Sequence, residues 1–261
     1  MSTKSLSDMI SQFDIKSITK IATLLFPLTV LSQAYEPDAC DASNPELKQL
    51  VNGGTIPSLY LHGCGPGWTD VISSSYLKAS GKPPSKPESP ESDSELLEEW
   101  EDYRYAYDLW TCKYSAYNLS DENTSTALVE GVEGNGIGEI VIVSSLDLSR
   151  PIEIWNGYGK SANLFKYNSR VKTLNVHVIT AQREGATQCG TFFKNARKVK
   201  SFSVSLKDYN GYQALDVPEL GTYGNESKEV GTPFWIAIEI TDVYKGEKWA
   251  DTCISEIRNI R

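Results

Sequence analysis

The sequence has few of the residues on which most enzyme active sites depend. It contains two histidines, His62 and His177, and five cysteines in 261 residues. It has no H-E-x-x-H zinc motif, no G-x-S-x-G nucleophile turn and no C-x-x-C pair. These absences leave a zinc protease, an α/β-hydrolase and a thioredoxin-type redox enzyme without support. His177 stands in a β-rich run beside Asn175 and Ile179, which favours a structural role.

Basic residues are also in the minority, because 25 Lys and Arg face 34 Asp and Glu, for a formal charge of −9. Binding to nucleic acid phosphates requires a basic surface. We therefore expect no nucleic-acid partner. The longest apolar stretch, residues 21–31, is shorter than the roughly 20 residues of a membrane span, so we expect no transmembrane anchor.

The N-terminus has the pattern of a signal peptide. Lys4, Lys16 and Lys20 precede the apolar stretch, and small residues end it at Ala34. The sequence thus predicts a signal peptide over residues 1–34 and a secreted or extracytoplasmic protein, with the periplasm and a cell surface among the options. The alternative is an amphipathic cytosolic helix.

All five cysteines follow the predicted cleavage site. In an exported protein they are expected to form structural disulfides, with one cysteine left over. The shortest loop would join Cys40 to Cys64, and a bridge from Cys112 to Cys253 would connect the two ends of the main domain. Cys189 has no assigned partner.

Composition divides the rest of the chain into three parts. Residues 35–78 are a small, glycine-rich, cysteine-containing segment, and residues 79–102 are rich in Pro, Ser and Glu, which predicts an extended, solvated linker. Residues 103–261 form the main domain. A helical period occurs only at residues 96–109, and alternating apolar residues at 137–143, 152–155, 171–179, 199–206 and 234–240 predict an all-β sandwich or jelly roll.

Four glycines crowd into eight positions before the first of these strands. A dinucleotide-binding loop must follow a strand and open a helix, whereas these glycines precede a strand and alternate with glutamates that would repel phosphate. The pattern favours a tight turn with positive φ angles. The glycines are Gly131, Gly134, Gly136 and Gly138.

The same run resembles a family signature. Residues 126–139, T-A-L-V-E-G-V-E-G-N-G-I-G-E, resemble the T-A-W-V-E-G-x-x-G-x-G-I-G-E signature of the NADase-type glycan-binding domain, with Leu128 at the tryptophan position. Three further blocks agree in order, at residues 156–161, 168–172 and 242–257. The resemblance implies a discoidin-like, galactose-binding-like jelly-roll β-sandwich, preceded by the small cysteine-containing segment and the Pro-rich linker.

The resemblance also carries functional expectations. It covers the accessory domain that precedes the catalytic domain in streptococcal NAD glycohydrolase and assists toxin translocation, so we expect no enzymatic activity. It implies a secreted recognition protein that binds glycan or a glycoprotein on a cell surface or matrix. One alternative is a protein-interaction or translocation module without sugar binding, and a weaker one is a hydrolase.

Sugar binding requires aromatic faces and fixed polar groups on loops. The segment from residue 155 to residue 170 supplies both, and a second candidate loop runs from residue 208 to residue 223. The predicted ligand-binding residues are Trp155, Asn156, Tyr158, Lys160, Tyr167, Asn168 and Arg170.

A second resemblance concerns a metal. Residues 118–126 are similar to the N-x-x-D-x-N loop that binds calcium in fucose-binding lectins, where a C-terminal glutamate completes the site. The implied ligands of a structural Ca²⁺ are Asn118, Asp121, Asn123, Thr126 and Glu256. The alternative is a turn in which Asp121 bonds only backbone amides.

Overall fold

The computed structural model describes residues 40, 42–62, 71–88, 94–226 and 232–260. All of them belong to one compact unit, residues 36–261. The predicted signal peptide and Cys64 lie outside the described residues.

The described residues form a predominantly β structure in which ten strands join one hydrogen-bonded network. Each run that the sequence predicted as a strand is one, and the predicted β-sandwich is confirmed. The strands are β1 (Thr55–His62), β2 (Val71–Ser73), β3 (Leu128–Val129), β4 (Ile140–Val143), β5 (Ile152–Asn156), β6 (Ser169–Thr187), β7 (Gly190–Ser205), β8 (Tyr212–Ala214), β9 (Phe234–Tyr244) and β10 (Thr252–Asn259).

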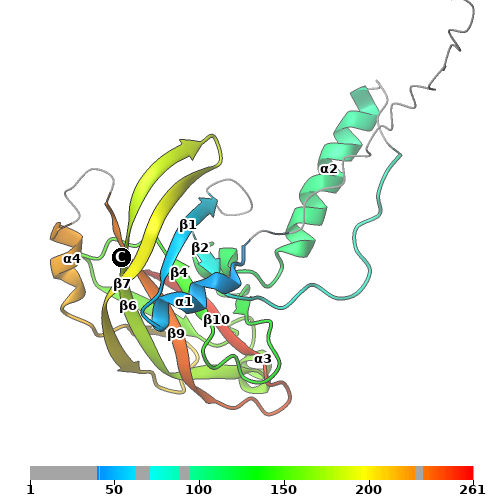
Figure 1. Cartoon of the computed structure of the whole chain (residues 1–261). Helices are drawn as coiled ribbons and strands as arrows, with labels where there is room; N and C mark the ends of the chain where they lie inside the picture. Colours follow the sequence, from blue (N-terminus) through cyan, green and yellow to red (C-terminus); the bar gives the residue numbers. More distant parts are fainter. Residues whose placement is uncertain (1–39, 41, 63–70, 89–93, 227–231, 261) are drawn as a thin grey trace, which may run out of the picture. The chain divides into compact units, whose positions relative to one another are not determined.

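The strands form two layers that share one corner. The first follows the order β2-β4-β9-β6-β7-β1, and the second contains β3, β10, β5 and β8. They join where β10 pairs in parallel with the start of β6, with Thr252 opposite Ser169 and Cys253 opposite Arg170. Figure 1 shows the long β6–β7 hairpin next to β1.

The main core lies between the two layers. Alternate residues of β6 and β9, such as Val176 and Ile238, pack in one cluster with Ile154 of β5 and Ile254 and Ile257 of β10. All of these side chains are almost completely buried. The period-two pattern of the sequence therefore selects the face that fills the sandwich.

A second core covers the opposite face of the first layer. Ile142, Ile179 and Trp235 pack there against Leu50 and Leu59, which come from the predicted N-terminal segment. That segment also supplies β1 and β2, which pair with β7 and β4. The boundary placed at residue 79 therefore does not separate two cores.

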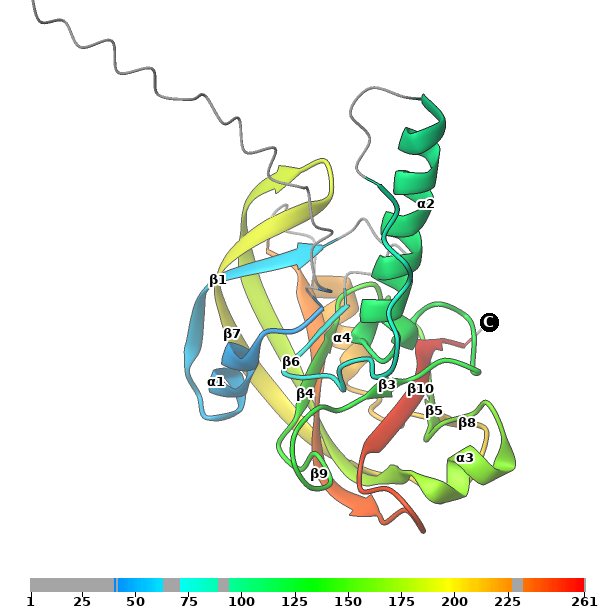
Figure 2. The same cartoon turned by 90° about the vertical axis from the view of Figure 1, so that its right-hand side faces the viewer.

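The helices are short except for one. The helical period predicted at residues 96–109 is confirmed by α2, which begins inside the predicted linker. Its Trp100 and Tyr103 are buried, and the Lys86 ammonium lies 5.5 Å from the Trp100 ring centroid. Figure 2 shows residues 77–88 running alongside α2. The helices are η3 (Pro45–Leu47), α1 (Lys48–Val51), α2 (Ser94–Thr111), η4 (Ala116–Leu119), α3 (Ala162–Tyr167) and α4 (Leu220–Glu226).

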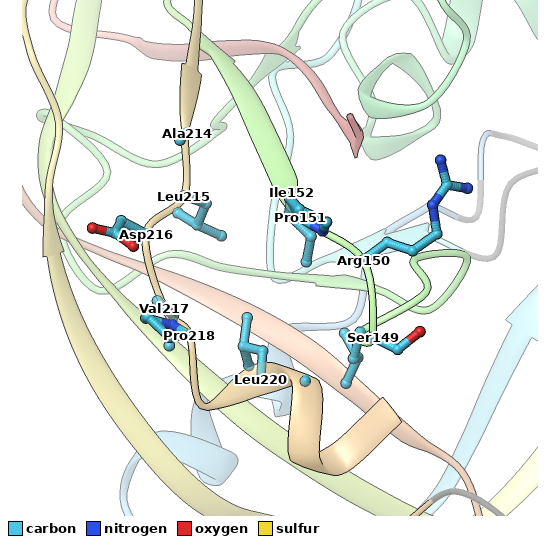
Figure 3. A pocket seen from close by; sticks show the side chains of 12 residues that line it. Ser149, Arg150, Pro151, Ile152, Ala214, Leu215, Asp216, Val217, Pro218 and Leu220 are labelled. Carbon is cyan, nitrogen blue, oxygen red and sulfur yellow. The ribbon is translucent and has the colours of Figure 1, made fainter. Parts of the chain in front are cut away.

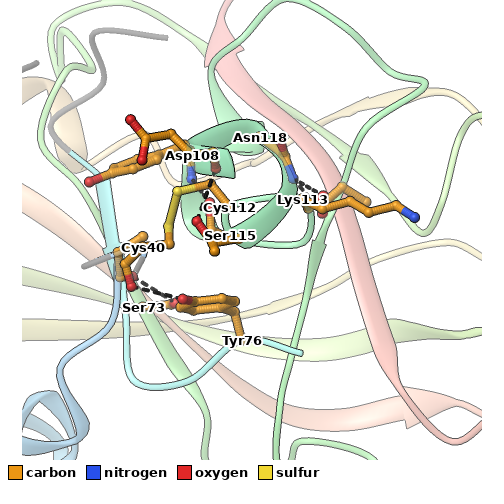
Figure 4. Close-up of a disulfide and its surroundings, with 12 residues drawn as sticks. Cys40, Ser73, Tyr76, Asp108, Cys112, Lys113, Ser115 and Asn118 are labelled. Carbon is orange, nitrogen blue, oxygen red and sulfur yellow. Dashed lines mark hydrogen bonds between the residues drawn. A yellow bond between two sulfur atoms is a disulfide. The ribbon is translucent and has the colours of Figure 1, made fainter. Parts of the chain in front are cut away.

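The disulfides differ from those predicted. Cys40 bonds to Cys112, across 72 residues of sequence, next to Tyr76, whose hydroxyl donates to the Cys40 carbonyl at 2.8 Å (Figure 4). The predicted Cys40–Cys64 and Cys112–Cys253 bridges are therefore wrong. Cys253 is a free thiol buried in β10, and Cys189 is disulfide-bonded. The local pairing fails because β2 joins the sheet and draws residues 42–44 alongside it, next to the end of α2.

Candidate functional site

The predicted calcium loop is organised around Asp121. Its carboxylate accepts hydrogen bonds from the Asn123 backbone N–H at 2.9 Å and from the Thr126 hydroxyl at 2.6 Å. The side-chain oxygen of Asn123 accepts a bond from the Ser125 N–H at 3.0 Å. Three of the predicted ligands thus share one turn, whose internal bonds are those expected of Asx turns.

Asn118 closes the base of this loop. Its amide nitrogen donates to the carbonyls of Lys113 and Ala127, both at 2.9 Å. Figure 4 shows the amide directed at Lys113. These two bonds fix the side chain and leave its carbonyl oxygen as the atom that would contact a cation.

Glu256 is the unusual member of the predicted set. It lies on β10 and is 1% exposed, and among the described residues neither carboxylate oxygen accepts a hydrogen bond of standard geometry, although the Asn123 backbone N–H lies close enough to lower the pKa of the group. Burial raises the pKa of Glu256 from its ordinary 4.5 to about 8, and the nearby charge of Asp121 adds to the rise while Arg258 opposes it. A buried carboxylate of this kind requires a proton, a cation or a ligand that donates hydrogen bonds.

The donor set suits a hard cation. Asp121, Asn123, Thr126 and Glu256 offer only oxygen atoms, which Ca²⁺ prefers. Burial also raises the pKa of Asp121, against the hydrogen bonds from Thr126 and Asn123 that lower it. The described residues contain no group of three or more His, Cys, Asp and Glu side chains placed to hold a metal, so a cation here would depend on amide, hydroxyl and backbone oxygens as well.

Three of the predicted sugar-binding residues hold the fold together. The Asn156 amide donates to the Val171 carbonyl at 2.6 Å and accepts from its N–H at 2.9 Å, which joins β5 to β6. Arg170 is 7% exposed and forms a bidentate pair with Asp208, at 2.7 and 3.0 Å. Asn168 donates to the Leu164 carbonyl at the end of α3, at 2.9 Å.

The other four lie closer to the surface. Trp155 donates from Nε1 to Asn210 at 3.2 Å and meets the ring of Tyr212 edge-on. Tyr158 packs against the small buried cluster around Cys253. Lys160 is exposed, and Tyr167 is half-buried.

The predicted residue Tyr167 pairs with an exposed aromatic residue, Trp249, that the sequence prediction missed. Trp249, 37% exposed, meets Tyr167 edge-on with ring centroids 5.7 Å apart, and the Lys248 ammonium lies 4.5 Å from the Trp249 centroid. We call Tyr167, Lys248 and Trp249 the aromatic platform. The family signature allows any residue at the position of Trp249, so the motif did not identify this tryptophan. An aromatic residue in a charged turn between two strands was the available signal.

The platform is held by backbone contacts. The N–H groups of Lys248 and Trp249 donate to the Tyr167 carbonyl at 3.1 and 2.8 Å, and that of Glu247 donates to the Lys166 carbonyl at 3.0 Å. Gly246 is required here, because a Cβ at this position would collide with the carbonyls of Tyr167 and Trp249. The β9–β10 turn and α3 therefore form one rigid surface.

A separate cavity of about 260 Å³ lies between residues 148–152 and 214–221 (Figure 3). Ile152, Leu215 and Leu220 make its wall largely apolar, and Figure 3 shows Asp216 and Arg150 directed away from its centre. An apolar cavity without inward polar groups has little means of fixing the orientation of a ligand.

His177 has the structural role that the sequence favours. It is buried, with Nδ1 2.7 Å from the Ser201 hydroxyl and Nε2 3.0 Å from Glu239, and burial lowers its pKa. The three residues lie on adjacent paired strands. The backbone N–H groups of paired strands bond to the neighbouring strand, so they do not form an oxyanion hole beside His177. The arrangement is a polar ladder on one sheet face.

Residues 107–259 match the sequence model of the NAD glycohydrolase translocation F5/8 type C domain. The chain belongs to this family. The matched range contains the predicted calcium loop, the aromatic platform and Glu256. The F5/8 type C domain of this family is an accessory translocation domain and not a catalytic one. The family and the discoidin-like fold predicted from the sequence are both confirmed.

The structure explains the signature of this F5/8 type C domain. Of the four glycines, Gly134, Gly136 and Gly138 have the positive φ angles predicted for a tight turn, whereas Gly131 does not and instead allows close approach of the Tyr76 carbonyl; β4 follows. Leu128 is 5% exposed in the main core, so the departure from the family tryptophan changes packing and not an exposed sugar-stacking surface.

Similarity beyond the F5/8 type C family is low. Two cryo-EM structures of the arabinofuranosyltransferase AftD from Mycobacteria, two classes of one mutant, are 12% and 11% identical to this chain, with TM-scores of 0.32 and 0.31. Each alignment covers 78% of this chain and 11% of that chain. No curated protein is significantly similar in sequence. Among the described residues, no helix combines the length and apolar character of a membrane span.

Proposed function

We propose that this protein is a non-catalytic recognition module that binds glycan on a cell surface or matrix through the aromatic platform. The observation that carries the proposal is the pairing of exposed Trp249 with half-buried Tyr167, which backbone hydrogen bonds hold in one orientation. Sugar rings present C–H faces that pack on aromatic rings, and a platform fixed in advance loses little entropy on binding.

Polar groups near the platform suit sugar hydroxyls. Lys248 stands over both rings, and Lys166 and Lys160 are exposed on α3 and just before it. Arg170 contributes indirectly in this proposal, because its bonds to Asp208 and to the Asn168 carbonyl support the end of α3 that carries Tyr167.

Calcium has a structural part in the proposal. A Ca²⁺ ion held by Asp121, Asn123, Thr126 and Glu256 would neutralise the buried Glu256 carboxylate and tie the loop to β10. The support is that Glu256 is buried and that, in the part of the chain that the structure describes, no side chain hydrogen-bonds to its carboxylate. The ion would stabilise the fold by mass action, since the unfolded chain does not assemble these oxygens.

The proposed location is outside the cytoplasm. The Cys40–Cys112 disulfide supports an oxidising compartment, because such bonds rarely persist in a reducing one.

A glycan array with the purified protein and its Trp249→Ala variant tests the function. We expect saturable binding to a subset of glycans and a loss of roughly tenfold or more in Trp249→Ala, since stacked aromatic contacts dominate such sites. Tyr105→Ala, which removes an exposed aromatic residue on α2, is the matched control and should bind normally. Uniform background binding, or full binding by Trp249→Ala, would contradict the proposal.

One observation favours the protein-interaction alternative. Leu97, Tyr105 and Leu109 are 50%, 63% and 44% exposed along one side of α2. Exposed apolar residues at helical spacing are typical of a helix that docks against a partner. Binding of a purified protein partner that is lost on changing these three residues to serine, and that sugars do not compete, would favour this function.

A further inference from the structure

Three exposed lysines lie at the aromatic platform. Lys166 is on α3 next to Tyr167, and Lys245 and Lys248 are in the turn between β9 and β10. We call Lys166, Lys245 and Lys248 the lysine cluster; Lys248 also belongs to the platform. The chain has a formal charge of −9, so a basic surface at this place differs from the character of the chain as a whole.

Arg170 holds the backbone of the lysine cluster together. Its Nη1 donates to the Lys166 and Lys245 carbonyls, both at 3.4 Å, so the two carbonyl oxygens share one donor nitrogen. The turn is also bonded to α3 directly, because the Lys248 N–H donates to the Tyr167 carbonyl at 3.1 Å. The three lysines therefore leave the backbone from neighbouring, fixed positions, while their side chains extend into solvent.

The lysine cluster has an excess of positive charge. Among the described residues, none of its three ammonium groups forms an ion pair, whereas nearby Arg170 is neutralised by Asp208. Two acids follow in the same turn, Glu247 and Asp251. The charge of Asp251 acts inward as well, because it raises the pKa of the buried Glu130 carboxyl. Three lysines against two carboxylates leave the surface basic.

The position of Lys248 favours a ligand that brings its own negative charge. The Lys248 ammonium lies 4.5 Å from the Trp249 ring centroid, so a cation–π contact covers part of one face of the indole. A neutral sugar that packs on this face displaces the ammonium and offers it only hydroxyl oxygens in return. A sugar with a carboxylate or sulfate offers a charged acceptor, and hydrogen bonds between charged groups are the stronger ones.

We propose that the platform selects acidic glycans, with the carboxylate or sulfate group held by the lysine cluster while the sugar ring packs on Trp249. The inference rests on the proposed glycan recognition and adds its ligand class. An extended anionic surface, such as a lipid bilayer, is repelled by the rest of this acidic chain, whereas one acidic sugar meets only the lysine cluster.

The test compares matched sugars with the full-length protein. Lactose, sialyllactose and sulfated lactose are titrated by calorimetry and saturation-transfer NMR, at low and at high salt. At low salt we expect at least one acidic sugar to bind roughly tenfold tighter than lactose, because hydrogen bonds to a charged group are added. The preference should shrink at high salt, since exposed charges are screened.

Two variants test the part of the lysines. Lys166→Gln combined with Lys245→Gln should reduce the ratio of acidic to neutral affinity roughly fivefold or more, since glutamine still bonds hydroxyls but carries no charge. Lys200→Gln, at an exposed lysine opposite Val178 on the paired strands β7 and β6, is the matched control and should keep the ratio. Thermal unfolding checks that each variant has normal stability.

Several results would overturn the inference. They are equal affinity for acidic and neutral lactose, an acidic preference unchanged in the double lysine variant, and binding to phosphatidylserine vesicles without binding to either acidic sugar. If Trp249→Ala loses binding to all three sugars but the unchanged protein has no acidic preference, the platform function stands and this inference fails. If no glycan is bound at all, both fail.

Discussion

Two regions of the molecule bury carboxylates in opposite ways. In the signature turn, Glu139 is 4% exposed and is paired with Lys48, and it accepts hydrogen bonds from Ser74 and Ser75 at 2.5 and 2.6 Å. Beside the predicted calcium loop, Glu256 is at least as buried, and no side chain among the described residues hydrogen-bonds to it.

The difference distinguishes an acid that is paired within the fold from one that requires a proton or a bound group. The partners of Glu139 come from α1 and from the residues after β2, so the turn is tied to the N-terminal segment that builds the second core. Those partners lower the pKa of Glu139 against the effect of burial, whereas burial and the charge of Asp121 raise that of Glu256. The same residue type is therefore held ionised by its partners at one site and favours the protonated form at the other.

The largest expected effect is at Glu139. We expect Glu139→Gln to destabilise the protein by about 3 kcal/mol, because the buried carboxylate loses its charged hydrogen bonds with Ser74 and Ser75 and turns an amide N–H₂ towards these donors, while the loss of the ion pair with half-exposed Lys48 adds little. The melting temperature should fall by about 6–12 °C. Glu133→Gln, at an exposed glutamate of the same run, should change it little. Equal effects of the two variants would show that the Glu139 network does not stabilise the turn.

The same substitution at Glu256 should have the opposite sign. Because its pKa in the folded state is about 8, Glu256 favours folding below about pH 4.5 and loses that contribution as the pH rises to about 8. In chelator at pH 8, Glu256→Gln should therefore stabilise the protein, by about 2 kcal/mol. Thermal unfolding measures the change.

With calcium present, the unchanged protein should be more stable than Glu256→Gln. Added Ca²⁺ should raise the melting temperature of the unchanged protein, more at pH 8 than at pH 5, because binding needs the ionised carboxylate. Glu256→Gln should show no calcium-dependent shift. Destabilisation by this substitution in chelator at pH 8 would instead assign Glu256 the structural role of Glu139.

The smallest expected effect concerns Glu130, which has hydrogen-bond partners like Glu139 but a raised pKa like Glu256. It accepts bonds from the Val132 and Thr252 N–H groups, yet burial raises its pKa to about 7. Its contribution to stability should decline as the pH rises from about 4.5 to 7. In a Glu256→Gln background, Glu130→Gln should reduce the loss of stability between pH 5.5 and 7.5 by about 1 kcal/mol. Denaturant titrations at the two pH values measure this, and an unchanged pH slope would contradict it.

The sandwich was predictable because its strands have a local pattern. Alternation along residues 171–179 and 234–240 is imposed by one buried face, so each strand is recognisable without its neighbours. The second core was not predictable in this way. Its residues, such as Leu50 and Trp235, meet only after β1 and β2 join the sheet, and no short stretch records that pairing.

The site was predictable only in part, for a related reason. Asp121, Asn123 and Thr126 stand within six positions, and spacing alone brings them together. Arg170 and Asn156 looked available for a ligand because their partners, Asp208 and Val171, are far away or on another strand. The exposure of Trp249 depends on how the β9–β10 turn meets α3, which a single sequence does not show.

The Cys40–Cys112 bond closes a covalent ring that includes the segment beside α2. Such a closure removes chain entropy from the unfolded state, about 4 kcal/mol for a loop of this length. It also determines what a single cut by a protease achieves. Cleavage within residues 77–88 would open the ring without releasing β1 and β2, which remain joined to the domain through sulfur and through pairing with β7 and β4. On a denaturing gel, the nicked protein would migrate as one band without reductant and as two fragments after reduction of the Cys40–Cys112 bond.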